Sequence, residues 1–276
     1  MIKVSEKLKT EHPRREVVSK HETVYREETV NKKVPVFSLM VNTISVSASL
    51  ARIMEWGINN KPAYVCFANV HMLAEAHRDE TFRSQVNSAN LVLPDGKPIA
   101  MSIKGFHGQK TERKAGMDFL PLVLSKADDK GARIFLYGSS LEIQEAMIKR
   151  IQLEYPYVQI AGNIVPPFEE LSQSELMDHI SQIKKSGAHI VLVSLGCPKQ
   201  EKWMAENSHR IPAVLLGLGG AFPVFAEMRS RAPQWMQRYS LEWLYRLVQE
   251  PRRMFKRYLY TNTLFLYLLA KKIIHR

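Results

Sequence analysis

Short apolar segments alternate with amphipathic ones through the middle of the chain, from about residue 63 to residue 222. Runs rich in β-branched residues, such as Ile190–Leu195, are typical of strands that are buried on both faces of a parallel sheet. The segments between them carry apolar residues at the spacing of an amphipathic helix. The alternation therefore predicts an α/β fold, a Rossmann-like and largely parallel sheet flanked by helices.

The same pattern sets approximate bounds for each element. Strands are expected at Ala63–Phe67, Leu91–Leu93, Ala132–Tyr137, Val158–Ala161, Ile190–Leu195 and Ala213–Leu218. Helices are expected at Thr43–Asn59, Val70–Asn87, Phe119–Ala127, Leu141–Glu154, Ser172–Ser186 and Glu201–Asn207. The polar, glycine-containing segment Lys104–Asp118 is expected to form a loop.

A polar cluster follows the strand expected at Ile190–Leu195. Gly196 ends the strand, and Lys199 and Gln200 lie where the next helix begins. Open parallel sheets bind ligands beyond the carboxyl ends of their strands, and the N–H groups of a following helix favour an anion. An ordinary turn with solvated charged side chains is the alternative, and spacing alone leaves both open.

Other polar residues also follow predicted strands. Asp95, in a Pro-Asp-Gly turn, is either a functional carboxylate or a turn residue that bonds its own backbone. Asn69 is either a ligand-binding residue or a helix N-cap. Gly138 opens a helix and suits a phosphate or ribose contact, although no GxGxxG or Walker motif is present.

Composition restricts the class of protein. No apolar run approaches the roughly 20 residues of a membrane-spanning helix, and the N-terminus is charged from Lys3 onward. The two cysteines, Cys66 and Cys197, cannot form a disulfide framework, and no Cys/His spacing is typical of a zinc site. We therefore expect a cytoplasmic protein.

The net charge of +12 is concentrated at the C-terminus. Residues 227–276 contain eleven lysines and arginines against three glutamates, whereas residues 36–226 are close to neutral. Residues 1–35 mix both signs with few large apolar side chains, which is typical of a mobile arm. The expected division is an arm (1–35), a Rossmann-like catalytic domain (36–226) and a C-terminal appendage (227–276).

The appendage mixes arginines with aromatic residues, including Arg246 in an amphipathic stretch that Pro251 interrupts. Short helices of this kind suit an anionic membrane surface, where arginines meet lipid phosphates. Packing of the aromatic side chains on the sheet domain is an equal and compatible alternative. A nucleic acid is a weaker candidate, because no recognised nucleic-acid-binding motif accompanies the charge.

Together, these motifs resemble those of the WecG/TagA/CpsF family of glycosyltransferases, over roughly Val36 to Arg257. In chain order they are Asn69, PDG at Pro94–Gly96, ER…GMD at Glu112–Asp118, GCPKQE at Gly196–Glu201, GLGGAF at Gly217–Phe222 and RAPQW…LEWLYRLVQEPRR at Arg231–Arg253.

The resemblance implies a hexosyltransferase that moves a hexose or N-acetylmannosamine-type sugar from a UDP-sugar to a polyprenyl-diphosphate-linked glycan. The family's reactions build enterobacterial common antigen, teichoic acid linkage units, capsule and exopolysaccharide. Inversion at the anomeric centre without a metal or other cofactor is implied, and the chain has no DxD motif. Family members are often oligomeric, and the implied location is the inner face of the plasma membrane.

The resemblance also assigns residues to roles. Asp95 matches the proposed catalytic base, while Arg113 and Gln200 match residues that line the sugar or diphosphate. Arg246, with Arg252 or Arg253, would contact the leaving diphosphate or the acceptor as the appendage closes over the site. The remaining candidates for substrate binding are Asn69, Asp118, Gly138, Gly196, Lys199 and Gly219.

Two departures from the family pattern concern the donor sugar. Phe67 stands where many members have a threonine, and Pro223 stands in place of an aspartate. Two other functions remain open: an epimerase-like enzyme on a soluble UDP-sugar, and a non-catalytic module that binds membranes or polyanions.

Overall fold

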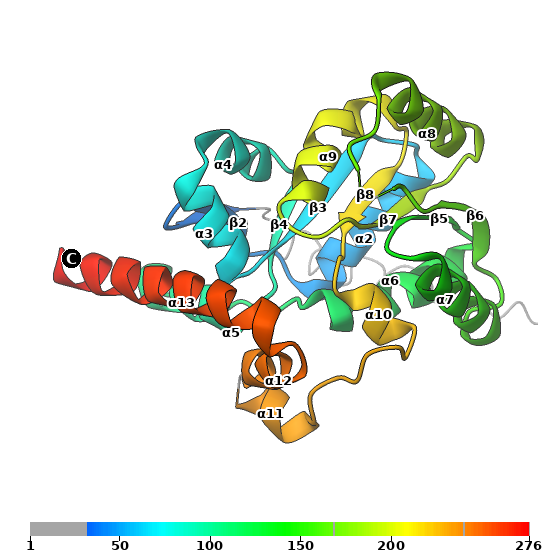
Figure 1. The fold of residues 1–276 in the computed structure, drawn as a ribbon. Helices are drawn as coiled ribbons and strands as arrows, with labels where there is room; N and C mark the ends of the chain where they lie inside the picture. Colours follow the sequence, from blue (N-terminus) through cyan, green and yellow to red (C-terminus); the bar gives the residue numbers. More distant parts are fainter. Residues whose placement is uncertain (1–31, 168, 240, 276) are drawn as a thin grey trace, which may run out of the picture.

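The computed structural model describes residues 32–167, 169–239 and 241–275. At its centre lies a six-stranded sheet with the strand order β4-β3-β8-β7-β5-β6, in which every pair of neighbours is parallel (Figure 1). The strands are β3 (Ala63–Ala68), β4 (Leu91–Pro94), β5 (Arg133–Gly138), β6 (Gln159–Ile164), β7 (Ile190–Ser194) and β8 (Val214–Gly217). The predicted α/β class with a parallel sheet is confirmed.

Helices cover both faces of this sheet. Those of the main body are α2 (Val46–Ile58), α3 (Val70–Arg78), α4 (Glu80–Asn87), α5 (Lys97–His107), α6 (Gly116–Lys130), α7 (Leu141–Glu154), α8 (Gln173–Lys185), α9 (Lys199–Asn207) and α10 (Ala221–Phe225). Alternate residues of β3 face opposite layers. Cys66 packs in the cluster that includes α3, α4, α8 and α9, and Val65 in the cluster with α2, α6, α7 and α10. Burial on both faces explains the continuous apolar runs of the strands.

The prediction of a single helix at Val70–Asn87 is wrong, because two helices, α3 and α4, meet at Asp79. The backbone of Asp79 is extended, and its side chain accepts a hydrogen bond from the backbone N–H of Phe82. Aspartate at this position caps a new helix. The apolar spacing continues across the break and so concealed it.

The loop predicted at Lys104–Asp118 is also partly wrong. Helix α5 continues to His107, where Gly108 ends it with a φ of +69°, and α6 already begins at Gly116. Ile99 and Ile103 are buried on one side of α5, and this packing stabilises the helix through Lys104 to His107, where a loop was expected. The loop itself is therefore confined to residues 108–115.

An N-terminal hairpin was not predicted. Strands β1 (Lys33–Val36) and β2 (Leu39–Asn42) pair antiparallel, and Phe37 at the turn makes edge contacts with the rings of Phe106 and Phe265. The hairpin begins before residue 36, where we placed the start of the catalytic domain. The arm predicted for residues 1–35 lies mostly outside the described residues, and the domain division stays a prediction.

In the described part of the chain after α10 lie three helices, α11 (Gln234–Arg238), α12 (Glu242–Gln249) and α13 (Pro251–Ile274). Pro251 does separate α12 from α13, but α13 has 24 residues and is not one of the short helices expected there. Pro251 occupies its first position, which tolerates proline because that N–H has no partner within the helix. Leu268 of α13 joins the core cluster that contains α3.

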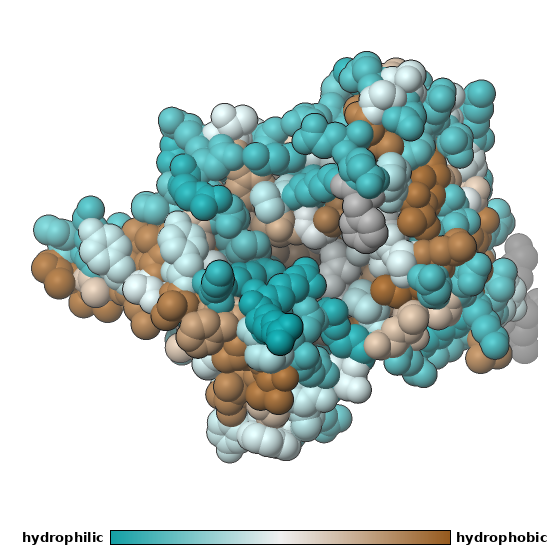
Figure 2. Space-filling model, in the orientation of Figure 1, coloured by the Kyte–Doolittle hydropathy of each residue, from teal (hydrophilic) through white to brown (hydrophobic). Residues whose placement is uncertain are grey.

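The outer side of the appendage carries many exposed apolar side chains. Figure 2 shows hydrophobic side chains along the lower edge of α13 and over the helices beneath it. The exposed apolar residues of this region include Trp243, Val248, Phe255, Leu259, Leu266 and Tyr267. Within the described residues, no helix has the length and hydropathy needed to cross a bilayer.

Candidate functional site

Several of the predicted site residues gather where the parallel strands end. Asn69 follows β3 and Asp95 follows β4, while Gly138, Gly196 and Gly219 lie at or just beyond the ends of β5, β7 and β8. Because β4, β3, β8, β7 and β5 are consecutive neighbours, these positions share one edge of the sheet. This is the edge at which open α/β sheets bind ligands.

Asp95 is held by two neighbours from other segments. Its Oδ2 accepts a hydrogen bond from Asn69 Nδ2 at 3.2 Å, and its Oδ1 accepts one from the backbone N–H of Gly116 at 3.3 Å. Asn69 Oδ1 also caps α3 by accepting bonds from the N–H groups of His71 and Met72. Asn69 is therefore the expected N-cap and also orients the carboxylate.

The environment of Asp95 favours a basic carboxylate. Burial raises the pKa of Asp95, while the Asn69 hydrogen bond, the charges of Arg246 and Arg113 and the N–H of Gly116 oppose this rise. The net result is a pKa above the ordinary value for aspartate. A carboxylate with a raised pKa is a stronger proton acceptor, which suits a general base.

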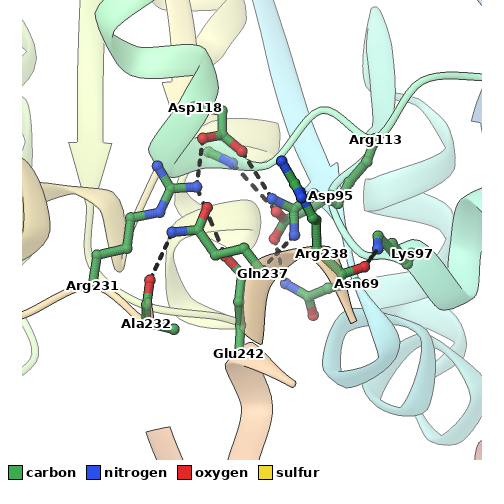
Figure 3. Close-up of polar contacts among 11 residues, drawn as sticks. Asn69, Asp95, Lys97, Arg113, Asp118, Arg231, Ala232, Gln237, Arg238 and Glu242 are labelled. Carbon is green, nitrogen blue, oxygen red and sulfur yellow. Dashed lines mark hydrogen bonds and ion pairs between the residues drawn. The ribbon is translucent and has the colours of Figure 1, made fainter. Parts of the chain in front are cut away.

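A charged network lies beside Asp95 (Figure 3). The terminal nitrogens of Arg113 bond Asp118, at 2.9 Å, and Glu242, while Arg231 bonds the other oxygen of Asp118. Arg231 also lies 3.7 Å from Glu242. Arg231 and Glu242 were not among the predicted site residues, although both lie in the matched C-terminal motif.

Arg246 reaches the same edge of the sheet from α12. One of its terminal nitrogens lies 3.0 Å from the point where a Cβ at Gly220 would be, and its charge lowers the pKa of Asp95. Arg252 and Arg253 are exposed on α13, and the ion pair described for Arg253 is with Glu250, at 3.0 Å. Of the three predicted arginines of the appendage, the structure thus brings Arg246 to Asp95.

Gln200 and Glu201 are buried at the start of α9, with exposed fractions of 5% and 0%. The alternative of an ordinary turn with solvated side chains is therefore wrong for Gln200 and Glu201, while Lys199 is exposed. Gln200 Nε2 donates to the carbonyl of Gly217 at 3.1 Å and to Glu201 at 2.6 Å. Burial raises the pKa of Glu201 to about 7.

Glycine is required at two of the loops. Gly138 has a φ of +99°, and a Cβ there would lie 2.4 Å from the carbonyl oxygen of Ser194. Gly219 has a φ of +45°, and its Cβ would lie 3.0 Å from Gln200 Oε1. The backbone of Ser194 leaves no room for a side chain at Gly138, and at Gly219 a side chain would adopt a strained φ and push against Gln200.

Phe67 and Pro223, the two departures from the family pattern, are structural residues here. Phe67 is buried and its ring makes an edge contact with Phe119 at 5.3 Å, while Pro223 lies inside α10. Among the described residues, no group of three or more His, Cys, Asp or Glu is arranged to hold a metal ion. Metal independence remains a prediction.

Comparisons with known proteins agree with the motifs. Residues 34–276 match the model of the "Glycosyl transferase WecG/TagA/CpsF family". A protein of Bacillus subtilis (strain 168) is 35% identical over 195 residues, which cover 69% of this chain and 73% of that protein. A protein of Bacillus spizizenii is also 35% identical over 195 residues, covering 70% and 74%. Both are named N-acetylglucosaminyldiphosphoundecaprenol N-acetyl-β-D-mannosaminyltransferase.

Proposed function

The chain belongs to the WecG/TagA/CpsF family of glycosyltransferases, and from this we propose that it moves an N-acetylmannosamine-type hexose from a UDP-sugar to a polyprenyl-diphosphate-linked acceptor. The names of both relatives support this acceptor class and this sugar. The single structural observation that carries the proposal is the carboxylate of Asp95, held by Asn69 and Gly116 beside Arg246.

The proposed reaction is an inverting displacement. The acceptor hydroxyl attacks the anomeric carbon, Asp95 takes the hydroxyl proton, and the bond between that carbon and the UDP oxygen breaks. UDP leaves with the bonding electron pair, so negative charge grows on its diphosphate. We assign stabilisation of this charge to Arg246, since a fixed cation in a partly buried site acts most strongly on charge that develops in the transition state.

The location of the acceptor suggests a role for the appendage. A polyprenyl diphosphate lies in a membrane, and the exposed apolar residues of α12 and α13 are accompanied by exposed Arg252, Arg253 and Lys256. This combination suits the interface of an anionic bilayer. We propose peripheral association with the inner face of the plasma membrane through this surface.

Donor specificity tests the proposal directly. Purified protein would be incubated with a short-chain prenyl-diphosphate-linked GlcNAc acceptor and, in parallel, UDP-ManNAc, UDP-Glc, UDP-GlcNAc or UDP-glucuronate. We expect UDP release with UDP-ManNAc that depends on the acceptor and on Asp95. Conversion of a UDP-sugar without acceptor would indicate an epimerase-like enzyme, and absence of UDP binding would contradict the proposal.

A further inference from the structure

Four charged side chains join the appendage to the main body, and we call them the clasp: Arg113 and Asp118 from the body, Arg231 and Glu242 from the appendage. Each arginine lies within ion-pair distance of both carboxylates (Figure 3). The side chains of Arg113 and Glu242 are only 19% and 18% exposed. Ion pairs of this kind couple more strongly than exposed ones, because breaking one leaves a partly buried charge without its partner.

Within the clasp, both terminal nitrogens of Arg113 already have carboxylate partners. One terminal nitrogen bonds Glu242 and the other bonds Asp118. These carboxylates raise the pKa of Arg113 although burial opposes them. A diphosphate that bound Arg113 through the same two nitrogens would have to displace both carboxylates and would leave them with Arg231 as their shared cation, beside its own negative charge.

Glu242 is also a neighbour of Arg246 on the surface of one helix. Both lie on α12, four residues apart, so their side chains project from the same face one turn from each other. Fixing Glu242 against Arg113 therefore fixes the part of α12 that carries Arg246. In this position Arg246 reaches the loop at Gly220, and its positive charge lowers the pKa of Asp95.

We propose that Arg113 is a positioning residue that acts through Glu242 on Arg246, and does not bind the donor diphosphate itself. Asp118 and Arg231 complete the clasp and hold the two main partners in place. This inference rests on the proposed function for its kinetic consequences, but the contact between the body and α12 can be measured without any substrate.

The first test uses Arg113→Gln, Glu242→Gln and the double variant. Hydrogen exchange of the α12 amides should rise in each single variant, and the double variant should exchange no faster than either single one. Unchanged exchange in Arg113→Gln would overturn the proposal. Because this readout needs no substrate, its failure is distinct from failure of the proposed transfer reaction.

Kinetics and binding separate a positioning residue from a phosphate ligand. Each single variant should lower kcat/KM about 10- to 100-fold, and the double variant should lose little more, since both changes remove one interaction. If Arg113 binds the diphosphate instead, Arg113→Gln will weaken the binding of UDP while Glu242→Gln leaves it unchanged or strengthens it. That result would overturn the proposal.

Two further variants separate the role of Arg246 from a general effect of removing an ion pair. Gly220→Ala places a Cβ 3.0 Å from the Arg246 guanidinium and should lower kcat/KM without loosening α12. Arg229→Gln breaks a comparable ion pair with Glu250, whose partners are 31% and 26% exposed, and should leave kcat/KM within about twofold of wild type. A loss in Arg229→Gln equal to that in Arg113→Gln would show a general effect of charge and overturn the assignment.

Discussion

The side chain of Asn69 connects the first turn of α3 to the carboxylate of Asp95. Its Oδ1 accepts hydrogen bonds from the N–H groups of His71 and Met72, both at 3.1 Å, and its Nδ2 donates to Asp95 at 3.2 Å. Turning the amide over would place its oxygen against the carboxylate and its nitrogen against two N–H donors. The helix cap therefore determines that a donor faces Asp95.

Replacing Asn69 should change the pH dependence of transfer. Asn69→Ser keeps an N-cap but removes the donor, and the Asn69 hydrogen bond lowers the pKa of Asp95. Without it the pKa rises further, so Asp95 is deprotonated only at higher pH. The acidic limb of kcat/KM should move to higher pH. A limb that stays in place would show that Asp95 is not the titrating base.

Asp95→Asn removes the proposed base and leaves a side chain of similar shape. Loss of a general base typically costs about 10² to 10⁴ in rate, so transfer should fall by that factor while UDP binding is retained. Calorimetry with UDP and a UDP-release assay measure the two effects. Asp129→Asn, which changes an exposed carboxylate paired with Lys126, is the control. Transfer near the wild-type rate in Asp95→Asn would contradict the assigned role.

Glu201 should make the protein less stable as the pH rises. Burial raises the pKa of Glu201 to about 7 in the folded protein, from an ordinary value of 4.5 for glutamate. The folded state therefore holds a proton that the unfolded state releases between these values, and stability falls as pH increases through this range. Above pH 7 the cost reaches about 3 kcal/mol.

Glu201→Gln removes this ionisation. Its free energy of unfolding should exceed that of wild type by more at pH 8 than at pH 4, as measured by urea denaturation at each pH. Glu206→Gln, on the exposed side of the same helix, should show no such difference. An equal effect of Glu201→Gln at both pH values would mean that the buried carboxyl is not protonated near neutral pH.

The apolar face of α13 should determine membrane association. Leu259 and Leu266 are 61% and 63% exposed, and replacing both with serine should reduce sedimentation with anionic vesicles while leaving thermal unfolding unchanged. Leu153→Ser is the matched control, because Leu153 is 82% exposed on α7. Equal vesicle binding by the double variant and the control would remove the support for this surface.

Local patterns were sufficient for much of the fold. Apolar runs located the strands of the parallel sheet to within a few residues, although not those of the N-terminal hairpin, and the motifs placed Asn69 and Asp95 at strand ends. Parallel strands bring their carboxyl ends to one edge, so this part of the site follows from chain order once the strands are recognised. The break at Asp79 escaped because the apolar spacing continues across it, and α5 escaped because it contains Pro98 and Gly105, residues that are typical of turns.

The sequence by itself determined the fold class, the family and the base candidate Asp95. Only the tertiary structure decided that Glu242 pairs with Arg113, from which it is separated by 129 positions, and that Arg246 and not Arg253 reaches the site. Periodicity reports which face of an element is buried, because burial repeats with the local backbone geometry. It carries no information on which distant charge meets another, since that depends on how the appendage packs against the body.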